Sequence, residues 1–563
     1  MRPATMILPL LLLAACASSS GAPHPTNLAD DAGGRSAYGL FLSGEGALNE
    51  GQSHEAGEYF AKALQKAGDE SLLTERAFTA ALLAGDIDRA AALAPQGEEV
   101  ADSVKRLGRL VRAVKALSDG DGKAAKAMLG AEDFGFPHRS AAVLLAPWAA
   151  AEAGDVEGSL VLPEVRGDRM VEYFGKLGQA HLFERVRRYD EAETDFKAVT
   201  NGESPPQLMV LAYGAFLERR GRRKDAIALY DVALGRDPGS YGVKAARDRA
   251  VAGKPAPPAP TLRQGAGMAL LAPAATMLSA KQNQLALANL RLALRLDPTR
   301  DEAWVMLGDV KAEEGDIQAA REAYSQPKPG SPDYLTARAK LAWSYQSEKN
   351  TEAALKLARE AAATGDSDAR LNLADLLRVN EHYDEAITLL SGLITDAKEP
   401  DWRLFYARGV AYERLNRWPD AERDLEQALK LQPDDPEVLN YLGYSWIDRG
   451  VRVKEGMALV EKAVAANPKS GAMTDSLGWA HYRLGDYKKA VDLLEAAVEM
   501  EAGEPEINDH LGDALWRVGR RDEARFQWRR VLTLDPPAKI KTSAETKLAA
   551  GLPPDRPAPK PGI

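Results

Sequence analysis

Cysteine is almost absent from this chain of 563 residues, which contains a single one, Cys16. No internal disulfide can therefore form. The seven histidines show no metal-ligand spacing, and His54 lacks the second histidine four residues on that a zinc-protease helix requires. No Gly-x-Ser-x-Gly motif is present, and Lys123 of the sequence Gly-Asp-Gly-Lys is followed by Ala124, where a phosphate loop needs Ser or Thr. We therefore expect a protein that is not an enzyme, without catalytic residues, metal or cofactor.

An excess of positive charge is missing as well. Lys and Arg number 72 against 82 Asp and Glu, which gives a formal net charge of −10. Nucleic-acid-binding chains are expected to carry a basic stripe, and anionic lipid surfaces attract basic segments. We therefore expect neither nucleic acid nor a lipid surface as a broad partner. The negative charge keeps a large protein soluble.

What the chain does contain is a pattern repeated every 34 or 35 residues. Four clear copies begin at Trp402, Pro436, Gly471 and Pro505. Each has glycine at its eighth place, counted from the first residue of the copy: Gly409, Gly443, Gly478 and Gly512. Alanine fills the twentieth place in three copies, at Ala421, Ala490 and Ala524, and in the copy from Pro436 the small residue is Gly456, one place later. Three copies end in proline, at Pro433, Pro468 and Pro536. Ala and Leu, which are abundant here, favour helices.

The same register continues towards the N-terminus, with starts at Ala37, Ser71, Arg106, Ser140, Tyr173, Gln207, Gly267, Asp301, Leu335 and Ser367. Small residues at places 8 and 20 let two helices approach closely, and glycine at place 15 adopts the left-handed backbone that ends a helix. The pattern resembles the tetratricopeptide repeat (TPR). This resemblance implies an all-α superhelical solenoid of about fourteen helix-turn-helix units, each touching only its neighbours.

One break divides the series into two subdomains. Residues 241–252 predict an extra helix, and the segment from Lys254 to Pro260 contains four prolines, which favour stiff polyproline II. We therefore predict a signal peptide (1–15), a flexible tether (16–35), a degenerate N-terminal TPR array (36–252), a Pro-rich linker (253–266), a C-terminal TPR array (267–536), and a capping helix near 538–550 with a Pro-rich tail (537–563).

The first sixteen residues predict where in the cell the protein is located. Arg2 precedes the apolar stretch from Met6 to Leu13, which is too short to span a bilayer, as in a secretory signal. Leu13-Ala14-Ala15-Cys16 resembles the lipobox of bacterial lipoproteins. The resemblance implies that Cys16 becomes an acylated (palmitate-bearing) N-terminus and, since Ala17 rather than Asp follows, that the protein is anchored in the outer membrane and faces the periplasm. The alternative is an ordinary signal peptide with an incidental cysteine.

In the TPR family, places 2, 5, 9, 12 and 13 of the first helix face the inner, concave surface. Carried over to the four clear copies, these places give a candidate partner-binding groove: Arg403, Tyr406, Arg414, Asn440, Tyr444, Asp448, Asp475, Trp479, Tyr482, Arg483, Asp509, Asp513, Trp516 and Arg517. Tyr, Trp and Arg dominate binding hot spots. The aspartates at place 5 argue against a clamp for a chain-terminal carboxylate, and an acidic, aromatic groove suits a partner segment with Arg or Lys.

Alternative roles exist for several of these aromatic residues. Trp479 and Trp516 could instead pack on a neighbouring first helix. Trp304, Trp418 and Trp528 fall at packing places, so we expect them in the core. His481 and His510 lie on first helices, where a surface or groove role is favoured over a metal site.

Residues 399–536 resemble a narrower family through the sequences at 439–444, 475–479 and 508–513. They are similar to Gram-negative outer-membrane TPR lipoproteins that act as adaptors of a periplasmic carboxyl-terminal processing protease and collect cell-wall hydrolases. The resemblance implies a non-catalytic protein-binding scaffold. A second hypothesis is a glycan- or solute-binding component of an export, pilus or secretin system, in which Tyr444, Trp479 and Tyr482 stack on sugars.

Overall fold

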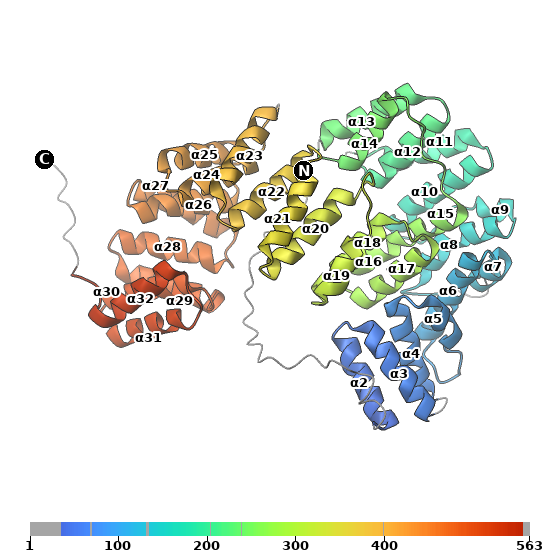
Figure 1. Ribbon diagram of the computed structural model, residues 1–563, viewed down its shortest axis with the longest axis horizontal. Helices are drawn as coiled ribbons and strands as arrows, with labels where there is room; N and C mark the ends of the chain where they lie inside the picture. Colours follow the sequence, from blue (N-terminus) through green and yellow to red (C-terminus); the bar gives the residue numbers. More distant parts are fainter. Residues whose placement is uncertain are drawn as a thin grey trace. The chain divides into compact units, whose positions relative to one another are not determined.

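The computed structural model describes residues 35–554 except 68–69, 131–133, 203, 238 and 398. Every regular element within these residues is an α-helix (Figure 1). The predicted signal peptide, most of the tether and the end of the tail lie outside the described residues. By its contacts the chain divides into two compact units. The boundary along the sequence lies between Leu376 and Leu377, inside helix α22 (Ser367–Val379). We describe each unit separately and call them the N-terminal and the C-terminal unit.

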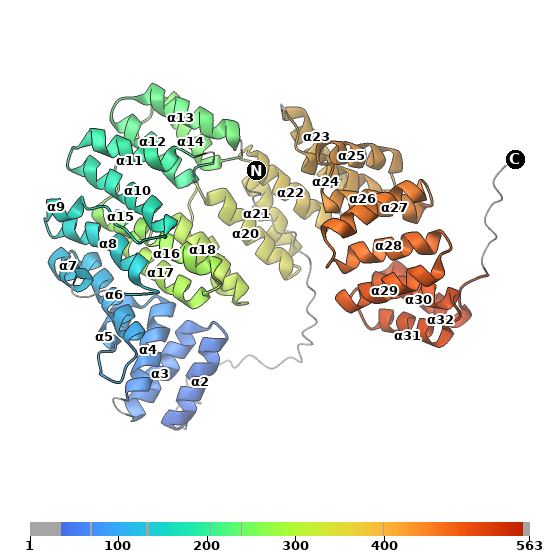
Figure 2. The ribbon, with the colours of Figure 1, turned by 180° about the vertical axis from the view of Figure 1, so that it is seen from behind.

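The N-terminal unit consists of short helices that pair as hairpins (Figures 1 and 2). Its helices are α2 (Ala37–Asn49), α3 (Ser53–Ala67), α4 (Ser71–Ala84), α5 (Ile87–Leu93), α6 (Asp102–Asp119), α7 (Gly122–Gly130), α8 (Arg139–Glu152), α9 (Val156–Ser159), α10 (Arg169–Arg185), α11 (Tyr189–Thr200), α12 (Gln207–Arg219), α13 (Arg223–Arg236), α14 (Tyr241–Val251), α15 (Leu262–Ala269), α16 (Leu271–Ser279), α17 (Asn283–Leu296), α18 (Asp301–Glu313), α19 (Ile317–Tyr324), α20 (Tyr334–Ser347) and α21 (Thr351–Ala362).

The C-terminal unit is a regular run of hairpins that ends in one extra helix. Its helices are α23 (Tyr383–Asp396), α24 (Trp402–Arg414), α25 (Trp418–Leu431), α26 (Pro436–Arg449), α27 (Val453–Ala466), α28 (Gly471–Arg483), α29 (Tyr487–Met500), α30 (Pro505–Arg517), α31 (Arg521–Leu532) and α32 (Ala538–Ala550). The helix predicted near 538–550 is therefore confirmed as α32, as is the extra helix predicted over 241–252, which is α14.

All fourteen predicted units share a left-handed residue at place 15, where the first helix of each hairpin ends. The φ angles there lie between +56° and +91°. The residues are Gly51, Gly85, Gly120, Gly154, Arg187, Gly221, Lys281, Gly315, Lys349, Glu381, Asn416, Gly450, Gly485 and Gly519. A positive φ reverses the chain after a helix, and glycine adopts it at no steric cost. The predicted solenoid of about fourteen hairpins is thus confirmed, including the copies whose sequence lacks the glycine.

In six hairpins the two helices approach closely because glycine at place 8 lies under the side chain at place 24. A Cβ on Gly44 would lie 2.6 Å from the Phe60 ring, and one on Gly512 would lie 2.5 Å from the Trp528 indole. Four further hairpins repeat the contact with Tyr230, Tyr324, Leu425 or Leu494 at place 24. Of the three tryptophans predicted to lie in the core, Trp528 is fully buried, whereas Trp304 and Trp418 are only partly buried against hydrophobic core residues.

Helix starts follow the capping chemistry of the sequence. The Asp435 carboxylate accepts hydrogen bonds from the backbone N–H groups of Glu437 and Val438, at 3.0 and 3.2 Å, and Pro436 occupies the first helical position of α26. Proline is well tolerated there, because its missing N–H has no partner in a first turn. The same polar-residue-before-helix pattern opens α28, whose Ser470 hydroxyl accepts from Met473 N–H.

One part of the N-terminal unit departs from the expected order. After the proline-rich segment the chain turns back: α15 packs on α8 and α10, and α17 packs on α4, α5 and α6 (Figure 2). A single hydrophobic core therefore runs from Leu40 to Ala323. The expectation that each unit touches only its neighbours and shares no common core is wrong for this region, because the extended linker lets later helices reach helices well over one hundred residues earlier.

The proline-rich segment, predicted as a boundary between subdomains, lies within the N-terminal unit. Arginine side chains hold its carbonyl groups: Arg219 donates to the Pro257 oxygen at 3.0 Å, and Arg223 donates to the Gly253 oxygen at 3.3 Å. At its end, Thr261 forms a capping box that opens α15. Gly265 then lies against the Trp148 ring, where any Cβ would collide. A proline carbonyl remains free to accept a hydrogen bond, so the segment is held at Gly253 and Pro257.

Lys349 tests the left-handed turn, because it is an exposed, non-glycine residue at place 15 with a φ of +61°. A Cβ in this region costs energy, so Lys349→Gly should raise the local stability of α20 and α21 by up to ~1 kcal/mol. Lys356→Gly, an exposed position inside α21, is the matched control and should lower it by about 1 kcal/mol. Amide hydrogen exchange of 334–362 measures both changes. Equal destabilisation by the two substitutions would contradict the assignment.

Candidate functional site

The predicted groove residues lie on the first helices of the last four hairpins, α24, α26, α28 and α30, all in the C-terminal unit. Their contacts differ from one helix to the next. Those on α26 and α28 join an aromatic cluster, those on α30 contact the chain's own C-terminal helix, and those on α24 lie at the other end of the run.

The centre of this surface is a stack of rings that we call the aromatic cluster: Tyr444, Trp479, Tyr482 and His510. Trp479 stacks on Tyr482 with ring centroids 4.5 Å apart and planes 6° from parallel. It also stacks on His510, at 4.1 Å and 14°, and Tyr444 lies 6.4 Å from the same imidazole. Aromatic pairs at such distances add to the energy of burial. The cluster therefore joins three consecutive first helices through rings rather than aliphatic contacts.

His510 is held in the cluster by an ion pair. Its Nδ1 lies 3.0 Å from both carboxylate oxygens of Asp475 on the preceding first helix, and only 6% of His510 is exposed. Burial opposes the charged imidazole, yet the Asp475 carboxylate raises the pKa of His510 to about 9. Burial in turn raises the pKa of Asp475, against the lowering effect of His510. Because the contact is so close, we assign an imidazolium and a carboxylate at neutral pH.

His510 was not among the predicted groove residues, although a surface or groove role was expected for it. It lies at place 6 of its unit, one residue after place 5, which is one of the places that face the concave surface in the TPR family. The spacing of 35 residues between Asp475 and His510 was the available signal, since one repeat plus one residue brings these two places together. The same spacing joins Tyr482 to Arg517, whose Nε lies 3.2 Å from the tyrosine hydroxyl.

Three polar atoms of the predicted groove residues are buried without a hydrogen-bond partner among the described residues: Asn440 Oδ1, Trp479 Nε1 and Asp509 Oδ1. Around them the other polar groups are engaged. Tyr444 donates its hydroxyl proton to Glu506 at 2.7 Å, and Arg483 donates to the Asp448 backbone oxygen. A buried, unpaired donor or acceptor costs about 1–3 kcal/mol, so Asn440 Oδ1 on α26 and Trp479 Nε1 on α28 mark positions where a further contact would be favourable.

The last repeat is already occupied by the chain itself. Lys547 on α32 lies 2.6 Å from Asp509 and 2.7 Å from Asp513, which are two of the predicted acidic groove residues. Gly551 lies directly on the Trp516 indole, where a Cβ would collide. Arg517 donates to the Pro553 backbone oxygen at 2.7 Å. Asp509, Asp513, Trp516 and Arg517 thus contact residues 547–553.

The α24 end of the surface is more open. Arg403 pairs with Asp401 on the same helix start, and the exposed Arg414 lies 3.8 Å from Glu413. Tyr406 meets Tyr441 edge to face at 5.7 Å. Arg403 and Arg414 contact residues near them in the chain, and Tyr406 contacts α26. These side chains therefore extend the surface but do not belong to the aromatic cluster.

Neither a metal centre nor a membrane-spanning helix is found among the residues of 35–554 that the structure describes. No group of three or more His, Cys, Asp and Glu side chains there could hold a metal ion. No helix in that part of the chain is long and apolar enough to cross a membrane.

Comparison with known proteins gives matches to repeat families. One tetratricopeptide-repeat model matches residues 177–241, 278–333, 406–471 and 476–539, and a second matches residues 345–409. The TPR repeat-containing protein PA4667 of Pseudomonas aeruginosa is 31% identical over 216 residues, which cover 38% of this chain and 36% of that protein. The aligned region therefore spans about a third of the relative's length.

Comparison with solved structures also gives matches. MamA of Desulfovibrio magneticus RS-1 is 21% identical, covers 30% of this chain and 94% of its own, and has a TM-score of 0.27. The APC/C hetero-tetramer Cut9–Hcn1 is 15% identical, covers 91% of this chain and 96% of its own, and has a TM-score of 0.39. The repeats matched by the family models coincide with hairpins of the structure, from α10 to α31. The chain is a tetratricopeptide-repeat protein.

Proposed function

We propose that this protein is a non-catalytic scaffold, anchored through a lipid on Cys16 to the periplasmic face of the outer membrane, that binds protein partners on the inner surface of its C-terminal unit. Tetratricopeptide repeats serve as surfaces for protein interaction. The finer parts of the proposal, the lipid, the location and a periplasmic protease or cell-wall hydrolase among the partners, rest on the sequence resemblances of residues 13–16 and 399–536.

The aromatic cluster is the observation that carries this proposal. Trp and Tyr, with Arg483 beside them, are the residues that dominate binding hot spots. Here they lie on consecutive first helices, and the unpaired Asn440 Oδ1 and Trp479 Nε1 lie on the same helices, α26 and α28. A partner segment that supplied a donor to Asn440 Oδ1 and an acceptor to Trp479 Nε1 would satisfy both atoms. A peptide backbone offers this pair of groups in every residue.

The C-terminal helix shows what chemistry this surface accepts. Asp509 and Asp513 hold the Lys547 ammonium between them, and Arg517 holds a backbone carbonyl. Helix α32 ends the array as a capping helix does, so the lysine contact is part of the fold. It supports a partner segment that carries Lys or Arg together with exposed backbone groups, as the acidic residues of the groove predict.

A glycan partner is the second candidate. Sugars are bound by exposed aromatic faces, but Trp479 already stacks on two rings of the chain itself. Little of its face is left for a sugar ring, so the geometry favours a protein segment. Stabilisation by cell-wall fragments in a thermal-shift assay, with no protein captured, would reverse this preference.

The groove is tested by capture of partners from an envelope extract. The chain lacking residues 1–16 should retain a protease or cell-wall hydrolase, identified by mass spectrometry after crosslinking. Trp479→Ala combined with Arg483→Ala should reduce that capture at least about tenfold, because hot-spot residues each contribute more than ~1 kcal/mol. Helical circular dichroism reports whether the variant is folded.

The matched control for this experiment is Phe526→Ala combined with Arg529→Ala on α31. These residues also form an exposed aromatic and arginine pair in the last hairpin, with Phe526 59% exposed, but they lie on a second helix. Capture should be unchanged in this variant. A folded Trp479/Arg483 variant that captured the same proteins as the control would remove the groove assignment.

The His510 ion pair predicts a pH dependence. A histidine with a raised pKa stabilises the folded state fully below its ordinary pKa of 6.5, and this contribution is lost as the pH rises through about 9. The free energy of unfolding should therefore fall between pH 7 and pH 10, by up to about 3 kcal/mol from this group. NMR of the imidazole should show a titration midpoint near 9. In His510→Gln the specific loss should vanish, and a midpoint below 7 in the unmodified protein would refute the assignment.

The proposed anchor is tested separately. Cys16→Ser removes the only thiol that could be acylated. The unmodified protein should be labelled by a palmitate analogue and sediment with outer membranes, whereas the variant should be unlabelled and released with the periplasmic contents, since stable anchoring requires the acyl chains. Equal fractionation of the two proteins would show that Cys16 does not anchor the chain.

A further inference from the structure

A second site lies in the N-terminal unit, where α17 returns against α4 and α6. A cavity of about 470 Å³ opens there, which is within the range of small-molecule sites. Its walls are formed by Ala84, Gly85, Ser118, Arg291, Leu294, Arg295, Pro298 and Trp304. These residues come from four hairpins, which start at residues 71, 106, 267 and 301. The first two are separated from the last two by the linker, so the pocket exists only because the linker lets the chain turn back.

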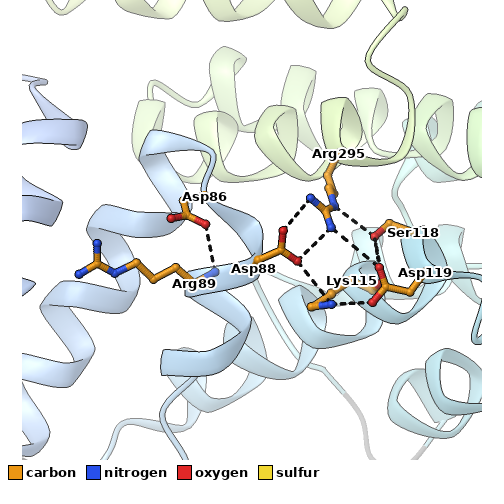
Figure 3. A network of polar contacts seen from close by, with 7 residues as sticks. All are labelled: Asp86, Asp88, Arg89, Lys115, Ser118, Asp119 and Arg295. Carbon is orange, nitrogen blue, oxygen red and sulfur yellow. Dashed lines mark hydrogen bonds and ion pairs between the residues drawn. The ribbon is translucent and has the colours of Figure 1, made fainter.

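One wall of the pocket is an ionic network that is already balanced (Figure 3). Arg295 donates two hydrogen bonds of 3.0 Å to the Asp88 carboxylate and one of 3.1 Å to the Ser118 hydroxyl. Lys115 lies 2.5 Å from Asp119 and 3.4 Å from Asp88. Two cations thus face two carboxylates. This network fixes α17 on α5 and α6 and leaves no net charge for a ligand.

Arg291, one turn earlier on α17, is different. Its Nε donates to the Leu83 backbone oxygen at 3.0 Å, but no carboxylate forms an ion pair with it among the described residues. Burial lowers the pKa of Arg291, against the raising effect of Glu314 and Asp316. A guanidinium carries five N–H donors and remains charged in proteins, so the terminal nitrogens of Arg291 have unused capacity for an anion.

The residues around Arg291 are arranged to make room for it. Gly85 adopts a φ of +91°, and a Cβ at this position would lie 3.2 Å from the Arg291 side chain. Trp304 turns its indole N–H to the Pro298 backbone oxygen at 2.9 Å, so its ring presents carbon atoms to the pocket. With Leu294 and Ala84, the remaining walls are mainly apolar.

We propose that this pocket binds a monocarboxylate with a short apolar body, whose carboxylate pairs with Arg291 and whose body lies against Trp304, Leu294 and Pro298. The guanidinium fork matches a carboxylate with two parallel hydrogen bonds. Arg291 forms no ion pair among the described residues, and the negative charges of Glu314 and Asp316 act on it from a distance. A single negative charge is therefore favoured over a phosphate dianion. The carboxylate could belong to a free small acid or to the end of a peptide chain. This inference concerns the N-terminal unit and does not depend on the proposed function.

The test is a binding titration of the full chain, followed by saturation-transfer NMR, with four probes: propionate, N-acetyl-alanyl-alanine with a free carboxylate, the same dipeptide as its amide, and inorganic phosphate. Binding of a free-carboxylate probe is expected. The amide and phosphate should bind at least about tenfold more weakly, as expected when a charge-assisted hydrogen-bonded pair is lost. Binding of both carboxylates would indicate a free acid as ligand, and binding of the dipeptide alone would indicate a chain end.

Variants locate the site. Arg291→Gln should weaken carboxylate binding at least about tenfold, whereas Arg185→Gln, an exposed arginine on α10 of the same unit, should leave it unchanged. Ala84→Leu narrows the pocket without removing any charge, and should weaken binding even if Arg291→Gln disturbs the fold. The proposal is overturned if no carboxylate binds, if amide or phosphate binds as tightly, or if Arg291→Gln and Ala84→Leu bind as the unmodified protein does.

Discussion

Close contact between the two helices of each hairpin is the constraint on which this molecule depends. Glycine at place 8 lets a ring or leucine at place 24 lie directly on the opposite helix backbone. The left-handed residue at place 15 then turns the chain at the same point in every unit. All fourteen hairpins share both features or the second alone. In the C-terminal unit the first helices α26, α28 and α30 pack on one another in succession, and their side chains form a common surface.

The C-terminal unit uses that surface for polar and aromatic contacts between consecutive repeats. Asp475 reaches His510, Tyr482 reaches Arg517, and Asp509 reaches Lys547, so each first helix contributes an acceptor or ring that the next one binds. Contacts of this kind hold neighbours in register but are more easily exchanged than an aliphatic core, because a partner can offer the same groups. This property makes the aromatic cluster a better candidate for recognition than the packed outer helices.

The N-terminal unit shows a different use of the same repeat. Its linker is held along its carbonyl groups by Arg219 and Arg223, and the helices that follow pack on earlier hairpins. Helices that would contact only neighbouring repeats in an open solenoid therefore share one hydrophobic core here. The pocket around Arg291 is a consequence of this return, since the hairpins of residues 71–119 and 283–304 would not meet in an open solenoid.

The sequence by itself determined the helical class, the fourteen hairpins, the place of each reversal and the buried role of Trp528, because these follow from spacing along one chain and from local backbone sterics. It also placed the groove residues on four first helices. Only the tertiary structure decided that His510 would stack in the aromatic cluster and that Lys547 would form ion pairs with Asp509 and Asp513. The same holds for the contacts of Arg295 on α17 with Asp88 and Ser118. These contacts join residues of separate helices, and for the last pair they span more than 170 residues, a separation at which neither periodicity nor propensity indicates which side chains will meet.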